Sequence, residues 1–100
     1  MPAVFEELLA KFEEYASSAY PNEVGAVIVG DELQIVINTH DSPTTNFRGR
    51  LPDDYDFFIH SHTIGDAKDE FSETDKRSQK LEARPWLLYY VEGRKWNKLQ

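Results

Sequence analysis

The chain of 100 residues is long enough for one domain, and its 18 acidic residues against 11 basic ones give a formal charge of −7. Because the sequence contains no basic cluster, this charge disfavours attraction to a phosphate backbone, and nucleic acid is not an expected partner. The chain has no cysteine, which excludes disulfides and thiolate nucleophiles, so a zinc site would need nitrogen and oxygen ligands.

The N-terminal region carries acids at Glu6 and Glu7, where a secretory signal would carry a basic segment followed by an apolar run. The longest apolar stretches are residues 25–30 and 86–91, and both are far shorter than a membrane span. We therefore expect no contact with a membrane and a cytoplasmic location.

The first part of the chain predicts a helix followed by a hairpin. Apolar residues recur at helical spacing over 4–16, with acids on the other face, and the helix is expected to end within 17–20. Residues 24–29 and 33–38 have the composition of strands, and the glycine and acids at 30–32 suit a tight turn between them.

A long polar segment follows this hairpin. Residues 39–54 contain two prolines and a glycine and are predicted to form a loop, which at such length is often functional in a compact domain. Residues 55–62 are predicted to form a third, central strand, and residues 63–71, rich in acids, a second loop.

The last third predicts a helix at 72–83, closed by a proline, then a strand at 86–91 and a short candidate strand at 94–98. The order is therefore α-β-β-β-α-β with this final candidate strand. It predicts an α/β protein of the α+β kind, in which helices pack against a mixed sheet. We expect one domain spanning residues 1–100.

The run His60-Ser61-His62 ends the predicted third strand. Because side chains alternate along a strand, both imidazoles should point to one face and Ser61 to the other. Two imidazoles on one side can begin a metal site, and Asp75 can supply a third ligand. Three protein ligands leave a position for water, which distinguishes a catalytic zinc site from a structural one.

The same residues also have a purely structural interpretation. His-x-His arises by chance in some chains, and Ser72-x-x-Asp75 makes a good helix start, with a hydroxyl cap and an acid in the first turn. On this interpretation the strand ends in two solvated histidines and the helix is ordinarily capped. His40, beside Asp41, is a further candidate ligand, although a solvated loop position is the favoured interpretation for it.

A zinc hydrolase also needs a base that takes a proton from water, and a glutamate that does not bind the metal suits this role. Glu23 lies at the start of the first predicted strand and is a candidate. Taken alone, it would be interpreted as a solvated charge after a proline turn.

Together, Glu23, His60-x-His62 and Ser72-x-x-Asp75 resemble the signature of the JAMM (MPN+) zinc metalloproteases. Within that family the chain is most similar to the JAMM domain of phage tail assembly protein K and its bacterial relatives, over about residues 21 to 96. The motifs that support this narrower likeness are Tyr20-Pro21-Asn22-Glu23-Val24-Gly25, Asn38…Pro43…Asn46-Phe47, Asp54-Tyr55, Asp75-Lys76-Arg77 and Pro85-Trp86.

The resemblance implies an MPN-like domain in which His60, His62 and Asp75 bind Zn²⁺. Glu23 would take a proton from the attacking water and pass it to the leaving amine, and Ser72 would donate a hydrogen bond to the oxyanion. The implied function is that of a zinc-dependent metallopeptidase or isopeptidase. Its substrate would be a protein or peptide, with a ubiquitin-like tail or a phage tail protein as candidates.

The chain departs from the family pattern between its second histidine and the serine. Thr63 stands where the family usually has proline, and the stretch from His62 to Ser72, which carries Asp66 and Asp69, is about two residues longer than usual. A helix that usually precedes the histidines is also missing.

Two other functions stay open. One is a non-catalytic MPN scaffold, a protein-interaction module of a phage tail tip, and the other is an unrelated small α/β binding module. Glu23 and Ser72 favour the enzyme over the scaffold, because a purely structural role needs neither of them. A phage-encoded chain would be found in the host cytoplasm or in the virion.

Overall fold

The computed structural model describes residues 2–63 and 70–99, and within this part of the chain it contains two helices and five strands. The elements are α1 (Pro2–Ala19), β1 (Gly25–Val29), β2 (Glu32–Val36), β3 (Phe57–His62), α2 (Glu73–Glu82), β4 (Trp86–Tyr90) and β5 (Lys95–Leu99). The predicted order and the α+β class are confirmed, and the candidate strand at 94–98 exists as β5. Most of the loop predicted at 63–71, with Asp66 and Asp69, lies outside the described residues.

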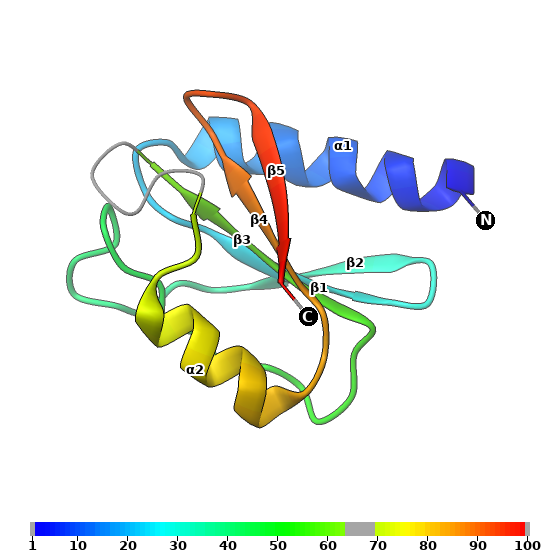
Figure 1. Ribbon diagram of the computed structural model, residues 1–100. Helices are drawn as coiled ribbons and strands as arrows, with labels where there is room; N and C mark the ends of the chain where they lie inside the picture. The colour runs from blue at the N-terminus through cyan, green and yellow to red at the C-terminus, as the bar shows by residue number, and fades with distance from the viewer. Residues whose placement is uncertain (1, 64–69, 100) are drawn as a thin grey trace.

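The five strands form one mixed sheet in the order β2-β1-β3-β4-β5 (Figure 1). The β3 and β4 strands pair in parallel, and every other neighbouring pair is antiparallel. A parallel pair needs a crossover connection, and α2 lies within the connection from β3 to β4. The strand order places β3 at the centre of the sheet. The crossover places α2 over one face of the sheet.

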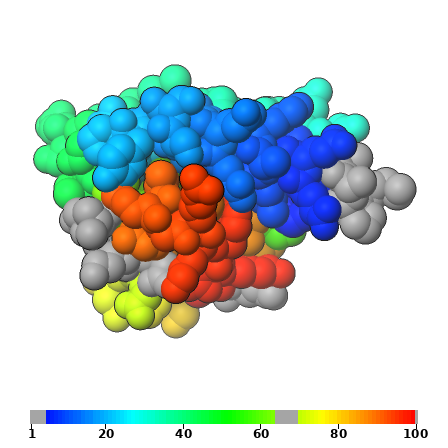
Figure 2. Space-filling view, turned by 90° about the horizontal axis from the view of Figure 1, so that it is seen from above, coloured from blue at the N-terminus to red at the C-terminus, as the bar shows by residue number. Residues whose placement is uncertain are grey.

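The α1 helix covers the opposite face of the sheet, with the β4–β5 hairpin beside it (Figures 1 and 2). Trp96 of β5 contacts Phe12 with ring centroids 6.1 Å apart, and its indole N–H donates to Glu13 Oε2 at 2.7 Å. The core on this side consists of buried residues from α1 and the sheet: Leu8, Phe12, Ala16, Val24, Ala26, Ile28, Ile59, Leu87 and Tyr89. No helix in the described ranges is long and apolar enough to cross a membrane.

A second apolar cluster lies on the face of the sheet that α2 covers. Its buried members are Val27, Val36, Tyr55, Phe58, Phe71, Trp86 and Leu88. The two clusters alternate along the strands, as the pleat of a sheet requires: Phe58 belongs to the α2 side and Ile59 to the α1 side. This alternation fixes which face of the sheet carries each side chain at the end of β3.

The ends of the elements follow local signals in the sequence. Gly30 adopts a left-handed conformation (φ 63°) in the two-residue turn between β1 and β2, where a residue with a Cβ would be strained. The α2 helix is capped by Ser72 and ends at Ala83, also left-handed (φ 57°). The second predicted strand ends at Val36 rather than at Asn38, because the Asn38 side chain takes up hydrogen bonds of the following loop.

Candidate metal centre

The two histidines of β3 lie on the face of the sheet that α2 covers, and both are 1% exposed. The predicted common orientation is confirmed, whereas the alternative of two solvated histidines is wrong. Ser61 points to the other face, as expected, and its hydroxyl accepts a hydrogen bond from Val24 N at 2.9 Å. The Ser61 N–H donates to Val24 O, also at 2.9 Å, so this pair ties β3 to the chain just before β1.

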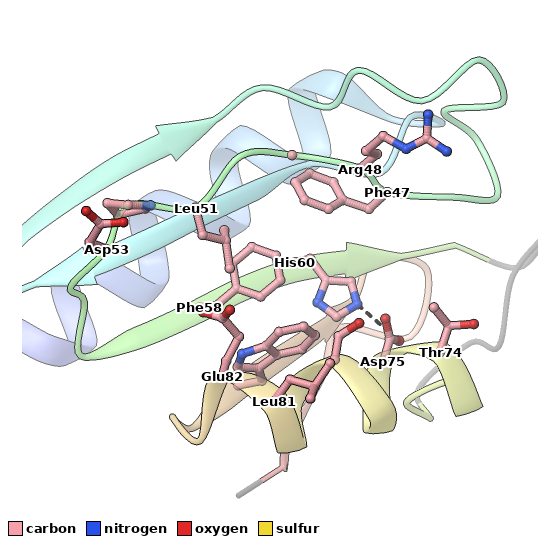
Figure 3. A pocket seen from close by; sticks show the side chains of 14 residues that line it. Phe47, Arg48, Leu51, Asp53, Phe58, His60, Thr74, Asp75, Leu81 and Glu82 are labelled. Carbon is pink, nitrogen blue, oxygen red and sulfur yellow. Dashed lines mark hydrogen bonds and ion pairs between the residues drawn. The ribbon is translucent and has the colours of Figure 1, made fainter.

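Asp75, in the first turn of α2, brings a carboxylate to the two imidazoles. Its Oδ2 lies 3.3 Å from His60 Nε2 and 3.3 Å from His62 Nε2, and the two Nε2 atoms are 3.1 Å apart. Figure 3 shows the contact from His60 to Asp75 across the gap between the sheet and the helix. Among the described residues these three side chains form the cluster that can hold a metal ion.

The spacing and chemistry of the three donor atoms fit zinc. A tetrahedral zinc ion with bonds of about 2.0 to 2.1 Å holds neighbouring ligand atoms about 3.3 Å apart. The three distances in this cluster, 3.1, 3.3 and 3.3 Å, are close to that value. Two imidazole nitrogens and one carboxylate oxygen are also zinc ligands in many hydrolases, and they leave one tetrahedral position open.

The ionisation state of the Asp75 carboxyl group suits a metal ligand. Burial alone would raise the pKa of this carboxyl group, but hydrogen bonds to His60 and His62, with a further one from Ser72 N, lower it well below its usual range. The carboxylate is therefore ionised at neutral pH, and a carboxyl ligand must be deprotonated before it binds a metal.

Packing fixes the orientation of the His60 ring. It stacks on Phe58, with ring centroids 5.3 Å apart and planes 12° from parallel. Three further aromatic rings surround it with centroids between 5.9 and 6.2 Å away, those of Phe47, Phe71 and Trp86. His60 Nδ1 is buried and has no hydrogen-bond partner within residues 2–63 and 70–99, so these rings, rather than a polar contact at Nδ1, hold the imidazole.

Ser72 lies next to the cluster as the N-cap of α2. Its Oγ accepts a hydrogen bond from Asp75 N at 3.1 Å, and its own N–H donates to Asp75 Oδ2 at 3.0 Å. This reciprocal capping box holds the Asp75 carboxylate where it meets the histidines. The expected capping role is thus confirmed, and the hydroxyl hydrogen of Ser72 is not used by it.

Glu23 is 1% exposed, so the interpretation as a solvated charge is wrong. In the antiparallel register of β1 and β3, Gly25 lies opposite His60, and the Val24–Ser61 hydrogen bonds continue this alignment by one residue. The next step places Glu23 opposite His62, and residues directly opposite each other share a face of the sheet. The structure therefore brings Glu23 to the side of the sheet that carries the metal cluster.

A groove of about 520 Å³ opens beside the cluster, between α2 and the segment that carries Phe47 and Asp53 (Figure 3). His60 and Asp75 form part of its lining. Phe47 packs on Phe58 with centroids 5.6 Å apart, and a Cβ at Gly25 would collide with its ring. Phe47 therefore both anchors the long loop and lines the groove.

Two polar residues whose roles the sequence did not suggest hold the long loop against the site. Asn38 Nδ2 donates to the carbonyl oxygens of Glu23 at 2.9 Å and Asn46 at 3.0 Å. Thr63, at the position where proline was expected, is buried and donates from Oγ1 to Thr44 O at 3.0 Å. The position of Asn38 at the end of a predicted strand, before a polar loop, is a weak indication that its side chain holds the loop. No feature of the sequence indicated the Thr63 contact.

His40 lies outside the cluster. Its Nδ1 accepts a hydrogen bond from Ser42 N at 2.9 Å, a local contact within the long loop. The favoured interpretation of His40 as a loop residue agrees with this position.

No protein-family model matches the chain, and neither does any curated protein.

Proposed function

We propose that this chain is a zinc-dependent peptidase or isopeptidase of the JAMM type. The observation that supports this most is the triangle of buried donor atoms from His60, His62 and Asp75, at the spacing of zinc ligands and at the end of a groove. A buried cluster that opens into a groove suits a hydrolase, because a substrate needs access to one side of the ion.

Each of the proposed site residues has a separate role in the reaction. His60, His62 and Asp75 hold the ion, and the chemistry that zinc supplies in such a site is Lewis acidity, which activates water and polarises a carbonyl group. Two elements on opposite sides of the gap provide these ligands, β3 and α2, so the folded sheet and the capped helix preorganise the site.

Glu23 is the proposed general base. Its carboxylate lies on the face of the sheet that carries the histidines, and it accepts a proton from the water that attacks the amide carbon. The same carboxylate then delivers this proton to the leaving nitrogen, so that an amine departs and the carboxylate is regenerated. Burial keeps bulk water from competing for this proton.

Ser72 is the proposed donor to the substrate carbonyl oxygen. Its Oγ accepts from Asp75 N, and the remaining hydroxyl hydrogen can point to an oxygen on which negative charge develops during attack. Because the cap fixes the position of Oγ, this donor needs no rearrangement when charge appears.

The metal site is tested first by the zinc content of protein purified without chelator. We expect about one zinc per chain in the wild type, and loss of the ion in His60→Ala. His40→Ala is the matched control, since it removes the one histidine that lies outside the cluster and should leave the zinc content unchanged. Equal zinc loss in both variants, or no zinc in the wild type after addition of the metal, would contradict the site.

The second part of the test measures hydrolysis of a mixture of random octapeptides by mass spectrometry. Glu23→Gln should keep its zinc and lose cleavage, because the amide is close in shape to the carboxylate but cannot accept the proton. Persistent cleavage in this variant would rule out the proposed mechanism. Zinc binding without hydrolysis by the wild type would instead favour the non-catalytic scaffold.

A further inference from the structure

Leu81, in the last turn of α2, is a large apolar side chain that is 87% exposed. It lies on the rim of the groove that leads to His60 and Asp75 (Figure 3). The rest of the apolar lining comes from three other parts of the chain: Phe47, Leu51 and Pro52 of the long loop, Phe58 of β3 and Trp86 of β4. An exposed leucine that borders an aromatic groove is what a surface binding an apolar side chain requires.

The two ends of the groove also differ in the residues that line them. Asp75 marks the metal end, and Glu82 lies on the same helix at the other end, where Asp53 approaches from the opposite side (Figure 3). Glu82 accepts a hydrogen bond from the Tyr55 hydroxyl at 2.9 Å, which orients its carboxylate. The end remote from the metal therefore presents two carboxylates to a ligand, and it suits a basic group.

The helix gives the distance between the two ends. Asp75 and Glu82 are separated by seven residues of α2, and at 1.5 Å per residue this corresponds to about 10 Å along the helix axis. An extended peptide covers about 10 Å in about three residues. A basic side chain that meets Glu82 and Asp53 would therefore lie about three residues from one held beside the metal.

We propose that the groove selects extended peptides with a large apolar side chain beside the bond at the metal and a basic side chain about three residues farther out. The apolar side chain is held by Phe47 and Trp86, whose rings lie 6.2 and 6.1 Å from that of His60. Leu81 contacts the peptide farther along the helix, and Asp53 and Glu82 hold the basic side chain. This inference rests on the proposed peptidase function for the identity of the bond at the metal, but its test measures binding and needs no hydrolysis.

The test uses the zinc-loaded Glu23→Gln protein and isothermal titration calorimetry. The probe is Ac-Lys-Gly-Gly-Leu-Leu-Gly-Gly-Lys-NH₂, which presents the same pattern in both chain directions. We expect it to bind about tenfold more tightly than its isomer Ac-Gly-Gly-Lys-Leu-Leu-Lys-Gly-Gly-NH₂, which has the same charge and composition. Replacing both leucines of the probe by serine should weaken binding by about tenfold or more.

Substitutions on exposed positions connect this preference to the groove. Leu81→Ser should weaken probe binding about tenfold, whereas Ile37→Ser, at another exposed apolar residue that is 68% exposed, should change it less than about twofold. Asp53→Asn with Glu82→Gln should abolish the preference for the probe over its isomer. Asp31→Asn with Glu32→Gln, at the exposed tip of the β1–β2 hairpin, should preserve it.

The results separate this inference from the proposed function. Equal binding of the probe and its isomer, no effect of Leu81→Ser, or no binding of any of the peptides would overturn the groove assignment. Zinc binding and hydrolysis by the wild type could still be observed in each of those cases. Selective binding by the zinc-loaded variant, when the wild type hydrolyses no peptide, would support the groove while the peptidase proposal fails.

Discussion

Ser72 combines a structural and a proposed chemical role in one hydroxyl group. Its Oγ accepts from Asp75 N and caps α2, while its hydrogen is the proposed donor to the substrate. A simple Ser72→Ala substitution would affect both roles, because loss of an N-cap costs about 1 kcal/mol of stability. Separating them requires a residue that caps a helix tolerably well but carries no hydroxyl.

Ser72→Gly meets this condition, since glycine at an N-cap costs only a few tenths of a kcal/mol relative to serine. We expect this variant to unfold in urea with nearly wild-type stability and to keep its zinc. Its kcat should fall by about 10²-fold or more, because one donor to the oxyanion is lost. Ser72→Thr, which keeps both the cap and the hydroxyl, is the control. Equal kcat for the glycine and threonine variants would remove Ser72 from the mechanism.

At individual positions, the sequence predicts the structure best where a periodicity determines which way a side chain points. Strand alternation correctly predicted that His60 and His62 share a face and that Ser61 lies on the other. Burial is a property of distant contacts, so the 1% exposure of Glu23 could not be derived from its neighbours in the chain. The roles of Asn38 and Thr63 depend on where a long loop lies, which no local pattern encodes.

At the scale of elements, the C-terminal end of α2 is attached to the sheet through Tyr55, which precedes β3. The Tyr55 hydroxyl donates to Glu82 Oε1 at 2.9 Å and receives a hydrogen bond from Trp86 Nε1 at 3.4 Å. The Arg84 guanidinium lies 5.0 Å from the centre of the Tyr55 ring. These contacts join α2 to β4 and support the groove end that carries Glu82.

Because of this attachment, the free energy of unfolding should depend on pH in the alkaline range. Burial, together with the hydrogen bond to Glu82, raises the pKa of Tyr55 from 10.0 to about 12 in the folded chain. A raised tyrosine pKa means that the protonated form stabilises the fold at and below pH 10, and that this stabilisation is lost as the pH rises through about 12. The neutral hydroxyl is thus the stabilising form.

We therefore expect Tyr55→Phe to be less stable than the wild type at pH 8 to 9 by about 1 kcal/mol, and this difference should narrow above about pH 10 and change sign by about pH 12. Urea unfolding at a series of pH values measures this difference, and the other tyrosines titrate alike in both proteins. A difference that stays constant up to pH 12 would show that Tyr55 does not titrate with unfolding.

The sequence predicted the elements well because helix periodicity, caps and turns are local. It predicted the Ser72 cap and the tight turn at Gly30, and missed the strand ends by one or two residues. It did not predict the sheet order. The parallel pairing of β3 with β4 is set by contacts between segments far apart in the chain, and this pairing positions α2, and with it Asp75, over the histidines.

Across the whole molecule, the candidate metal centre connects layers that are otherwise joined mainly by apolar packing. His60 and His62 belong to the central strand, and Asp75 to α2, which covers one face of the sheet (Figure 1). An ion bound by all three would link α2 to the sheet, and the separation of these elements on unfolding would destroy the site. Metal binding should therefore be coupled to the stability of the entire domain.

The midpoint of thermal unfolding, Tm, provides the measurement of this coupling. At a free zinc concentration of about 100 times Kd, binding to the folded chain alone adds about 2.7 kcal/mol, which for a domain of this size raises Tm by about 10 to 20 °C. Excess chelator should reverse the shift. His40→Ala should show the wild-type shift and His60→Ala should show none, because only the second removes a ligand. An equal shift in both variants would place the stabilising zinc away from the centre formed by β3 and α2.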